Sequence, residues 1–382
     1  MLTPAVSLSA YYFAYFAYVG AYSPYITLYL KDIGMTAVEI GLLYSIPQVM
    51  RIFGPNAWGH LADVSGKPRA IVRIAALASL LGFAGMYFGN SFAWLFAVLV
   101  VMHFFTSAQM PLIEAITLDQ VREAPGHYGR IRVWGSIGFV LAVLGLGYAL
   151  DYLPVRTVLH VTAGLLVLVL LAALAMPAPR HIALDAPRES LPEKLKLPAV
   201  RVFLAAGFLN AFAHAALYTF FSIYLDQNGY SKSAIGWMWT IGVLIEIIVF
   251  QSLPQLTKRF RLETLFFSTF VFCAIRFMLI AWAVDWWWML VIAQLMHAFT
   301  FAIYHASAVA LAGRLFGAGN QARGQAVYIS LTFGLGGFAG AMVSGTLWEV
   351  IGPSWTYSIS AAAGAIGALL LWPGQRAAAL TR

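Results

Sequence analysis

The sequence predicts an all-α membrane protein with twelve transmembrane helices arranged as two pseudo-symmetric six-helix bundles. The first observation is composition: 61% of the residues are apolar and 10% are charged, whereas soluble domains have about 25% charged residues. The second is a series of apolar segments near the roughly 20 residues that span a bilayer. The third is a sequence pattern that recurs after about half of the chain.

The apolar segments define the predicted helices. The twelve segments lie near residues 6–30, 38–62, 70–89, 92–118, 129–150, 155–177, 200–225, 234–256, 263–284, 286–312, 323–348 and 354–373. The longest polar stretch, 178–199, contains four prolines and is typical of a linker. We therefore expect one bundle over 1–177, a cytoplasmic linker over 178–199 and a second bundle over 200–382.

Basic residues are distributed unevenly between the two ends of these helices. If both termini are cytoplasmic, 18 of the 23 Lys and Arg residues lie on the cytoplasmic side and three on the opposite side. An excess of Lys and Arg on the cytoplasmic side predicts how the helices are oriented in the membrane. It also accounts for the net charge of +8 without a nucleic-acid partner. We expect a multi-pass protein of a bacterial inner membrane with both termini in the cytoplasm.

The internal repeat is clearest in two histidine segments. MHFFT at 102–106 returns as MHAFT at 296–300, 194 residues later. Tyr29, Leu30, Gly34, Ile40 and Gly41 return at an offset of 195. Two parallel repeats of six helices indicate a pseudo-symmetry axis along the membrane normal, which is typical of large transporters.

Ionisable residues inside the predicted helices are the candidate functional groups. Each costs about 2.5–3.5 kcal/mol on insertion scales, so intramembrane charges usually serve a function. The candidates are Arg51, His103, Glu114, Arg132, Glu246, Arg276 and His297. Three arginines against two glutamates favour an organic anion, and a protonated glutamate would increase the positive excess, so proton and anion would bind together. The alternative is ion pairs that only hold helices together.

Aromatic residues suggest a second feature of the site. Tyr11, Tyr15 and Tyr18 have i, i+4, i+7 spacing and share one helix face. Together with Trp134 they could line a cavity for a ring, although anchoring at the lipid interface is an equal alternative. His214, within an apolar segment, is either a packing group or a ligand.

Other chemistries lack a pattern in this sequence. The single cysteine, Cys273, excludes a disulfide framework and a cysteine-based zinc site. Gly-x-Gly pieces lie in apolar segments, where they indicate close helix packing rather than nucleotide binding. We predict no catalytic residues, no metal and no cofactor, and therefore no enzyme.

The segment 59–69, GHLADVSGKPR, resembles the loop signature G-x-L-A-D-x-x-G-[RK]-x-[RK] of the major facilitator superfamily. Val64 replaces the usual arginine after the aspartate. The resemblance implies that this loop braces the two halves on the cytoplasmic side during alternating access. Its expected gate residues are Gly59, Asp63, Gly66, Lys67 and Arg69.

Within that superfamily the chain resembles the branch of phenylpropionate permeases, nucleoside–proton symporters and lactose-permease-like proteins. Segments 128–136, 242–250 and 325–328 are similar to the phenylpropionate permeases. The lactose permease resemblance implies that Glu114 and Arg132, 18 residues apart, bind substrate. It implies that Glu246, Arg276 and His297 link substrate to proton.

One position departs from the lactose permease pattern. That family has a proton-carrying carboxylate three residues after the histidine, where this chain has Thr300. We therefore expect Glu246 to carry the proton, with Arg276 nearby.

Together these observations predict a monomeric, proton-coupled symporter that imports a small organic solute. We prefer an aromatic carboxylate such as 3-phenylpropionate. The predicted substrate contacts are Glu114, Arg132, Tyr11, Tyr15, Trp134 and Arg51. A sugar or nucleoside symporter is the alternative, since carboxylates accept hydrogen bonds from hydroxyls well, and a drug or metabolite exporter is third.

Overall fold

The structure is a computed structural model that describes residues 3–122, 127–177, 191–317 and 321–372. Within these residues the regular elements are all helical. The first six spans are α1 (Pro4–Asp32), α2 (Ala37–Ser65), α3 (Pro68–Ala84) with η1 (Gly85–Tyr87), α4 (Phe92–Gln120), α5 (His127–Leu150) and α6 (Thr157–Leu174).

The second half follows the short helix α7 (Leu191–Lys196). Its spans are α8 (Pro198–Gln227), α9 (Lys232–Arg259), α10 (Leu262–Trp282), α11 (Trp287–Leu295) continued by η2 (Ala298–Ile303) and α12 (Tyr304–Phe316), α13 (Gln321–Ile329) continued by η4 (Ser330–Gly336) and α14 (Gly337–Val350), and α15 (Pro353–Leu370). The predicted twelve-helix fold is confirmed. Within the described residues, nine helical segments are long enough and apolar enough to cross a membrane.

The chain divides into two compact units. Unit 1 is Met1–Leu184 with Tyr230–Trp237, and unit 2 is Asp185–Gly229 with Met238–Arg382. One boundary between the units falls inside the predicted linker, but residues 230–237 of the predicted second bundle group with unit 1. Residues 178–190 of the linker lie outside the described residues.

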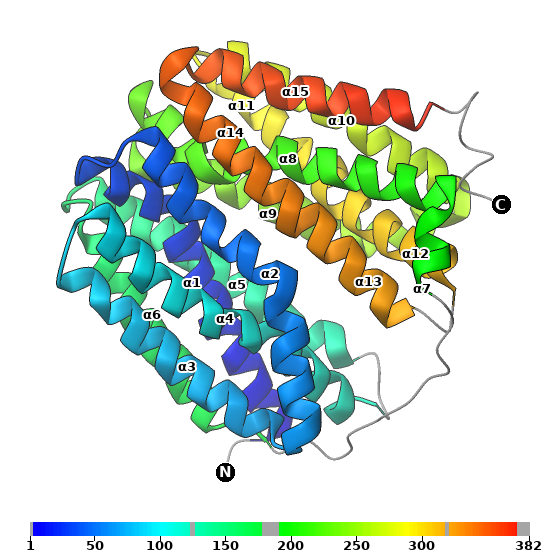
Figure 1. Ribbon diagram of the computed structural model, residues 1–382. Helices are drawn as coiled ribbons and strands as arrows, with labels where there is room; N and C mark the ends of the chain where they lie inside the picture. The colour runs from blue at the N-terminus through cyan, green and yellow to red at the C-terminus, as the bar shows by residue number, and fades with distance from the viewer. Residues whose placement is uncertain (1–2, 123–126, 178–190, 318–320, 373–382) are drawn as a thin grey trace. The chain divides into compact units, whose positions relative to one another are not determined.

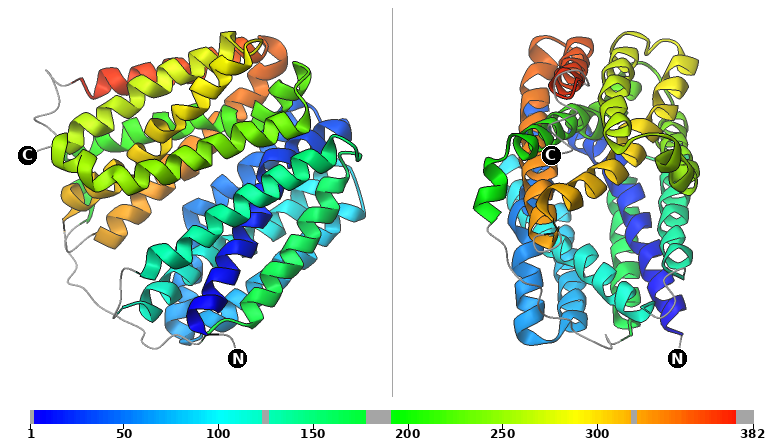
Figure 2. Two further views of the ribbon diagram at one scale, coloured as in Figure 1. Left: turned by 180° about the vertical axis from the view of Figure 1, so that it is seen from behind. Right: turned by 90° about the vertical axis from the view of Figure 1, so that its right-hand side faces the viewer.

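Unit 1 is organised around α1. This helix packs along α5 and α6, while α3 packs on α4 and α6, and α1 and α5 lie side by side in every view (Figures 1 and 2). Small residues allow the backbones to approach closely. A Cβ added at Gly20 would lie 2.5 Å from the Phe139 carbonyl oxygen, and one at Gly138 would meet that of Phe13.

Unit 2 repeats these pairings with the corresponding helices. α8 packs along η4, α14 and α15, and α10 packs on η2, α12 and α15. The close approach of a glycine to the backbone of a neighbouring helix also recurs. A Cβ added at Gly336 of η4 would lie 2.6 Å from the Phe208 carbonyl oxygen of α8. The predicted duplication is therefore visible in which helices pack together.

Gly34 and Gly229, which occupy equivalent positions in the repeat at an offset of 195, show why the repeat keeps a glycine there. They follow α1 and α8 and have φ angles of 88° and 79°. Only glycine adopts this left-handed region without steric cost. Both halves therefore end their first helix with the same turn.

The two units differ in the helix that carries the repeated histidine. α4 is a regular α-helix from Phe92 to Gln120. In the second half, the π-helical segment η2 begins immediately after His297 and contains Thr300. Such segments are rare and frequently lie at functional sites.

The signature loop at 59–69 also has a defined local structure. Gly66 ends α2 with a φ of 63°, and its N–H donates to the Ala62 carbonyl oxygen at 2.9 Å. Asp63 and Lys67 are exposed. The glycine therefore produces the turn that leads into α3.

Candidate functional site

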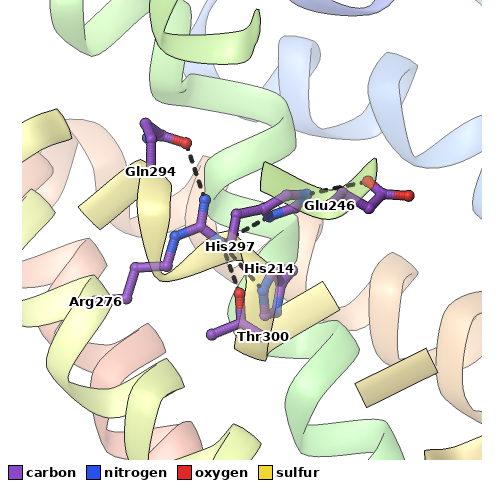
Figure 3. A network of polar contacts seen from close by, with 6 residues as sticks. All are labelled: His214, Glu246, Arg276, Gln294, His297 and Thr300. Atoms are coloured by element: carbon purple, nitrogen blue, oxygen red, sulfur yellow. Dashed lines mark hydrogen bonds and ion pairs between the residues drawn. The ribbon is translucent and has the colours of Figure 1, made fainter. Parts of the chain in front are cut away.

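Unit 2 contains a buried polar cluster formed by residues from four spans. Its members are His214 on α8, Glu246 on α9, Arg276 on α10, and Gln294, His297 and Thr300 on the α11–η2 span (Figure 3). Arg276 is completely buried. Three of the six, Glu246, Arg276 and His297, are the residues that the sequence predicts for proton coupling.

Arg276 lies at the centre of the cluster and contacts four neutral groups. Its Nη1 lies 2.9 Å from Thr300 Oγ1, 3.1 Å from His297 Nδ1 and 3.4 Å from His214 Nε2. Its Nη2 donates to Gln294 Oε1 at 3.1 Å. Among the described residues, no carboxylate oxygen lies within the 4.0 Å ion-pair distance of this guanidinium. The arginine is therefore a fixed buried charge in a neutral shell.

The hydrogen-bond partners assign the hydrogen of each imidazole. His214 Nδ1 lies 2.8 Å from the Asn210 carbonyl oxygen, which only accepts, so Nδ1 carries the hydrogen and Nε2 accepts from Arg276. His297 Nδ1 faces the same guanidinium, which only donates, so its hydrogen is on Nε2. A further proton on either acceptor nitrogen would point at Arg276. The arrangement therefore keeps both rings neutral.

Glu246 lies on the other side of His297. Its Oε2 is 3.9 Å from His297 Nε2, and its side chain is 23% exposed. The three residues thus form the order Arg276–His297–Glu246. The sequence predicts Arg276 near Glu246, and the structure shows that an imidazole with its N–H toward the carboxylate lies between them.

Gly242 provides room for this arrangement. It lies one turn before Glu246 on α9, and a Cβ there would be 3.3 Å from His297 Cδ2 and 3.7 Å from Gln294 Oε1. A side chain at this position would press on the imidazole, so glycine allows α9 to pack close to the cluster.

The candidate substrate residues lie in unit 1. The Arg132 guanidinium carbon lies 4.2 Å from the Phe16 ring centroid and 5.4 Å from that of Tyr12. Contacts of this kind contribute about 0.5–2 kcal/mol, depending on exposure. Glu114 is half-buried and lies within electrostatic reach of Arg132 and Tyr128. The predicted pair from α4 and α5 is thus brought together.

The predicted tyrosine face forms a continuous row on α1. The Tyr11 and Tyr15 ring centroids are 6.3 Å apart, and those of Tyr15 and Tyr18 are 5.9 Å apart. Tyr11 is completely buried and donates to Gln109 Oε1 at 2.6 Å. Tyr15 is partly exposed, whereas Trp134 and Arg51 are exposed. Tyr11 therefore belongs to the packing of unit 1 rather than to an accessible surface.

His103, the first-half counterpart of His297, has a simpler environment. It is buried, and its Nε2 lies 3.1 Å from the Tyr22 hydroxyl. The row of tyrosines on α1 thus ends at this histidine. His103 pairs with a neutral phenol, whereas His297 lies between an arginine and a glutamate.

Two members of the Arg276 cluster, Gln294 and Thr300, were not predicted to be functional. They lie three residues before and three residues after the predicted His297, and polar residues at every third position of an apolar run were an available signal. His214 had two open interpretations, a packing group or a ligand. Both of its ring nitrogens have partners within the protein, Asn210 and Arg276, which favours the packing role. Nothing in the sequence indicated that Phe16 would pack on Arg132.

Comparison with known proteins gives consistent matches over nearly the whole chain. Residues 5–359 match the family described as "MFS_1 like family". The chain is 29% identical over 344 residues to the "Probable 3-phenylpropionic acid transporter" of Escherichia coli strain K12, covering 89% of this chain and 90% of that protein. It is 28% identical over 378 residues to the "Maltose permease" of Geobacillus stearothermophilus, covering 96% and 94%.

Solved structures show the same fold. A crystal structure of a point mutant of the nucleoside transporter NupG superposes with a TM-score of 0.88 at 18% identity, covering 98% of this chain and 100% of that chain. The bacterial homologue of the human lysosomal transporter Spinster gives a TM-score of 0.65 at 15% identity, covering 96% and 94%.

Proposed function

The chain belongs to the MFS_1-like family of membrane transporters, and on this premise we propose that it imports a small organic acid together with a proton by alternating access. It is a multi-pass membrane protein and a secondary transporter of a small molecule. Beyond this, we propose the class of the substrate, its coupling to a proton and the inward direction of transport. The proposal also includes a cytoplasmic location for both termini, a bacterial inner membrane and a monomeric state, supported by the distribution of basic residues and by the family.

The Arg276–His297–Glu246 row carries the proposal of proton coupling. Both imidazoles present their acceptor nitrogens to Arg276, whereas the Glu246 carboxylate is partly exposed. We assign the transported proton to Glu246 for this reason. Protonation would remove the negative charge of the row and leave the buried Arg276 charge, and this net positive charge favours entry of an anion.

Arg132 supports an acid as the substrate. Its guanidinium packs on two aromatic rings, and guanidinium groups bind carboxylates with paired hydrogen bonds. The exposed ring of Trp134 could contact an aromatic group of the solute. A similar protein named for 3-phenylpropionic acid makes that compound the first to test.

A sugar or nucleoside is the second candidate. The half-buried Glu114 favours it, because a carboxylate accepts hydrogen bonds from hydroxyl groups. The similarity to a maltose permease agrees with this choice. In both cases we propose that Gly59, Asp63, Gly66, Lys67 and Arg69 form the cytoplasmic gate, since they fit the signature of the family.

A thermal-shift assay on the purified protein distinguishes the substrate classes. A ligand at about 100 times its Kd stabilises the folded state by about 2.7 kcal/mol. We expect 3-phenylpropionate to raise the melting temperature, whereas maltose and uridine leave it unchanged. A shift with maltose or uridine alone would replace the acid with the second candidate.

Replacement of Glu246 tests the coupling. In vesicles, Glu246→Gln should abolish accumulation of labelled 3-phenylpropionate driven by a proton gradient, because the amide cannot carry the proton. Exchange of labelled for unlabelled solute should continue. Glu349→Gln, at the exposed end of α14, is the matched control and should accumulate normally. Gradient-driven accumulation by Glu246→Gln would remove this carboxylate from the mechanism.

A further inference from the structure

The Arg132 guanidinium packs on an aromatic surface provided by α1. Tyr12 and Phe16 are four residues apart and therefore share one face of the helix. The guanidinium carbon lies over both rings, at 4.2 Å from the centroid of Phe16 and 5.4 Å from that of Tyr12. The two rings fix where the charged group lies relative to α1.

Gly135 provides the room for this contact on α5. It lies three residues after Arg132, on the adjacent part of the same helix surface. A Cβ at Gly135 would lie 2.9 Å from Arg132 Nη1 and 2.8 Å from Phe16 Cδ2. Neither distance is possible without movement, so any side chain here would displace the guanidinium or the ring.

This glycine differs from the packing glycine one turn later. At Gly138 an added Cβ would meet backbone atoms of Phe13, so a side chain there would push α1 and α5 apart. At Gly135 the nearest atoms all belong to side chains. A substitution at Gly135 can therefore be absorbed by a shift of Arg132 or Phe16, while the two helices keep their spacing.

The Tyr128 hydroxyl is a hydrogen-bond partner of Arg132, but an arginine has five N–H donors, so part of the guanidinium edge remains available for a ligand. All five N–H groups of an arginine lie in the plane of the guanidinium, so packing of its face on a ring leaves them directed sideways. Arg132 is partly exposed. In the part of the chain that the structure describes, no carboxylate oxygen lies within 4.0 Å of its nitrogens. The group is therefore held in place without being neutralised by a direct ion pair.

We propose that Tyr12, Phe16 and Gly135 are positioning residues that fix Arg132 so that its edge binds the carboxylate of the transported acid. This inference rests on the proposed function and defines its carboxylate subsite. The two rings orient the guanidinium, and the missing side chain of Gly135 lets it lie flat on them. Paired hydrogen bonds from such a fixed edge select a carboxylate over a neutral amide of the same shape.

The binding test compares two alanine variants of α5. Gly135→Ala should weaken binding of 3-phenylpropionate by about tenfold and bring its affinity close to that of 3-phenylpropionamide, because a misplaced edge loses its charge-assisted hydrogen bonds. Gly145→Ala is the control, since nothing lies within 4 Å of a Cβ at that position. It should bind like the wild type. An unchanged preference for the acid in Gly135→Ala would overturn the proposal.

A second measurement needs no substrate. Phenylglyoxal modifies arginine, and peptide mass spectrometry gives its rate at Arg132. We expect Gly135→Ala to change that rate by about twofold to fivefold, the equivalent of a cation–π contact, and Gly145→Ala to leave it unchanged. An unaltered rate in Gly135→Ala overturns the positioning role. If the wild type binds no acid but the rate changes, the proposed substrate fails while the positioning of Arg132 stands.

Discussion

Arg132 in unit 1 and Arg276 in unit 2 are both intramembrane arginines, but the two units surround them differently. Arg132 lies face-on against aromatic rings and is partly exposed. Arg276 is completely buried, and imidazole, amide and hydroxyl groups accept from its N–H groups. The first arrangement leaves part of the hydrogen-bonding edge for a ligand, and in the second both terminal nitrogens are used within the protein. The surrounding groups therefore determine the role of each charge.

The repeated histidines show the same divergence. His103 lies on a regular helix and pairs with a tyrosine. His297 directly precedes a π-helical segment and lies between Arg276 and Glu246. Both copies keep the frame of packed helices, because the pairings among helices are repeated in the two units. The two copies thus share their packing, whereas the chemistry around the histidine differs between them.

The largest expected difference between the two arginines is in stability. Arg276→Gln should lower the free energy of unfolding by about 3 kcal/mol or more, because it leaves several buried acceptors without a donor. Arg132→Gln should cost only about 0.5–1 kcal/mol, the value of an exposed cation–π contact. Thermal unfolding of the unliganded variants in one detergent measures both. Equal losses would show that Arg132 is as structural as Arg276.

A smaller effect should separate the two histidines. His297→Phe should reduce proton-driven uptake by about tenfold, equivalent to roughly 1.4 kcal/mol, because the N–H directed at Glu246 is lost. His103→Phe should leave coupling intact and lower stability by about 1 kcal/mol, through loss of the Tyr22 hydrogen bond. Vesicle uptake and thermal unfolding of both variants give the comparison. If His103→Phe lost coupling to the same extent, the two copies would be functionally equivalent.

Much of the fold could be predicted because its signals are local in the sequence. Apolar segments of the length of a bilayer give the number of helices. The offset of 195 places Gly34 and Gly229 at equivalent turns, and both have the left-handed conformation that favours glycine. The spacing of Tyr11, Tyr15 and Tyr18 predicts a shared face, and their rings do follow one another.

The candidate sites could be predicted only in part, since a sequence shows which groups are costly in a membrane but not what they contact. The charges at Glu246 and Arg276 were recognisable for that reason. The position of His297 between these two residues was not predictable, because it depends on how three helices are rotated about their axes. Gln294 and Thr300 are neutral and lack the energetic signal that marks a buried charge.

The sequence by itself determined that the chain crosses a membrane as two related bundles, because hydrophobic length and repetition are properties of the chain alone. Only the tertiary structure decided the role of each arginine. His214 meets Arg276 across 62 residues of sequence, and Phe16 of α1 meets Arg132 of α5. Such contacts arise when helices distant in sequence pack together. They determine whether a buried guanidinium is enclosed by the protein or left with an edge for a ligand.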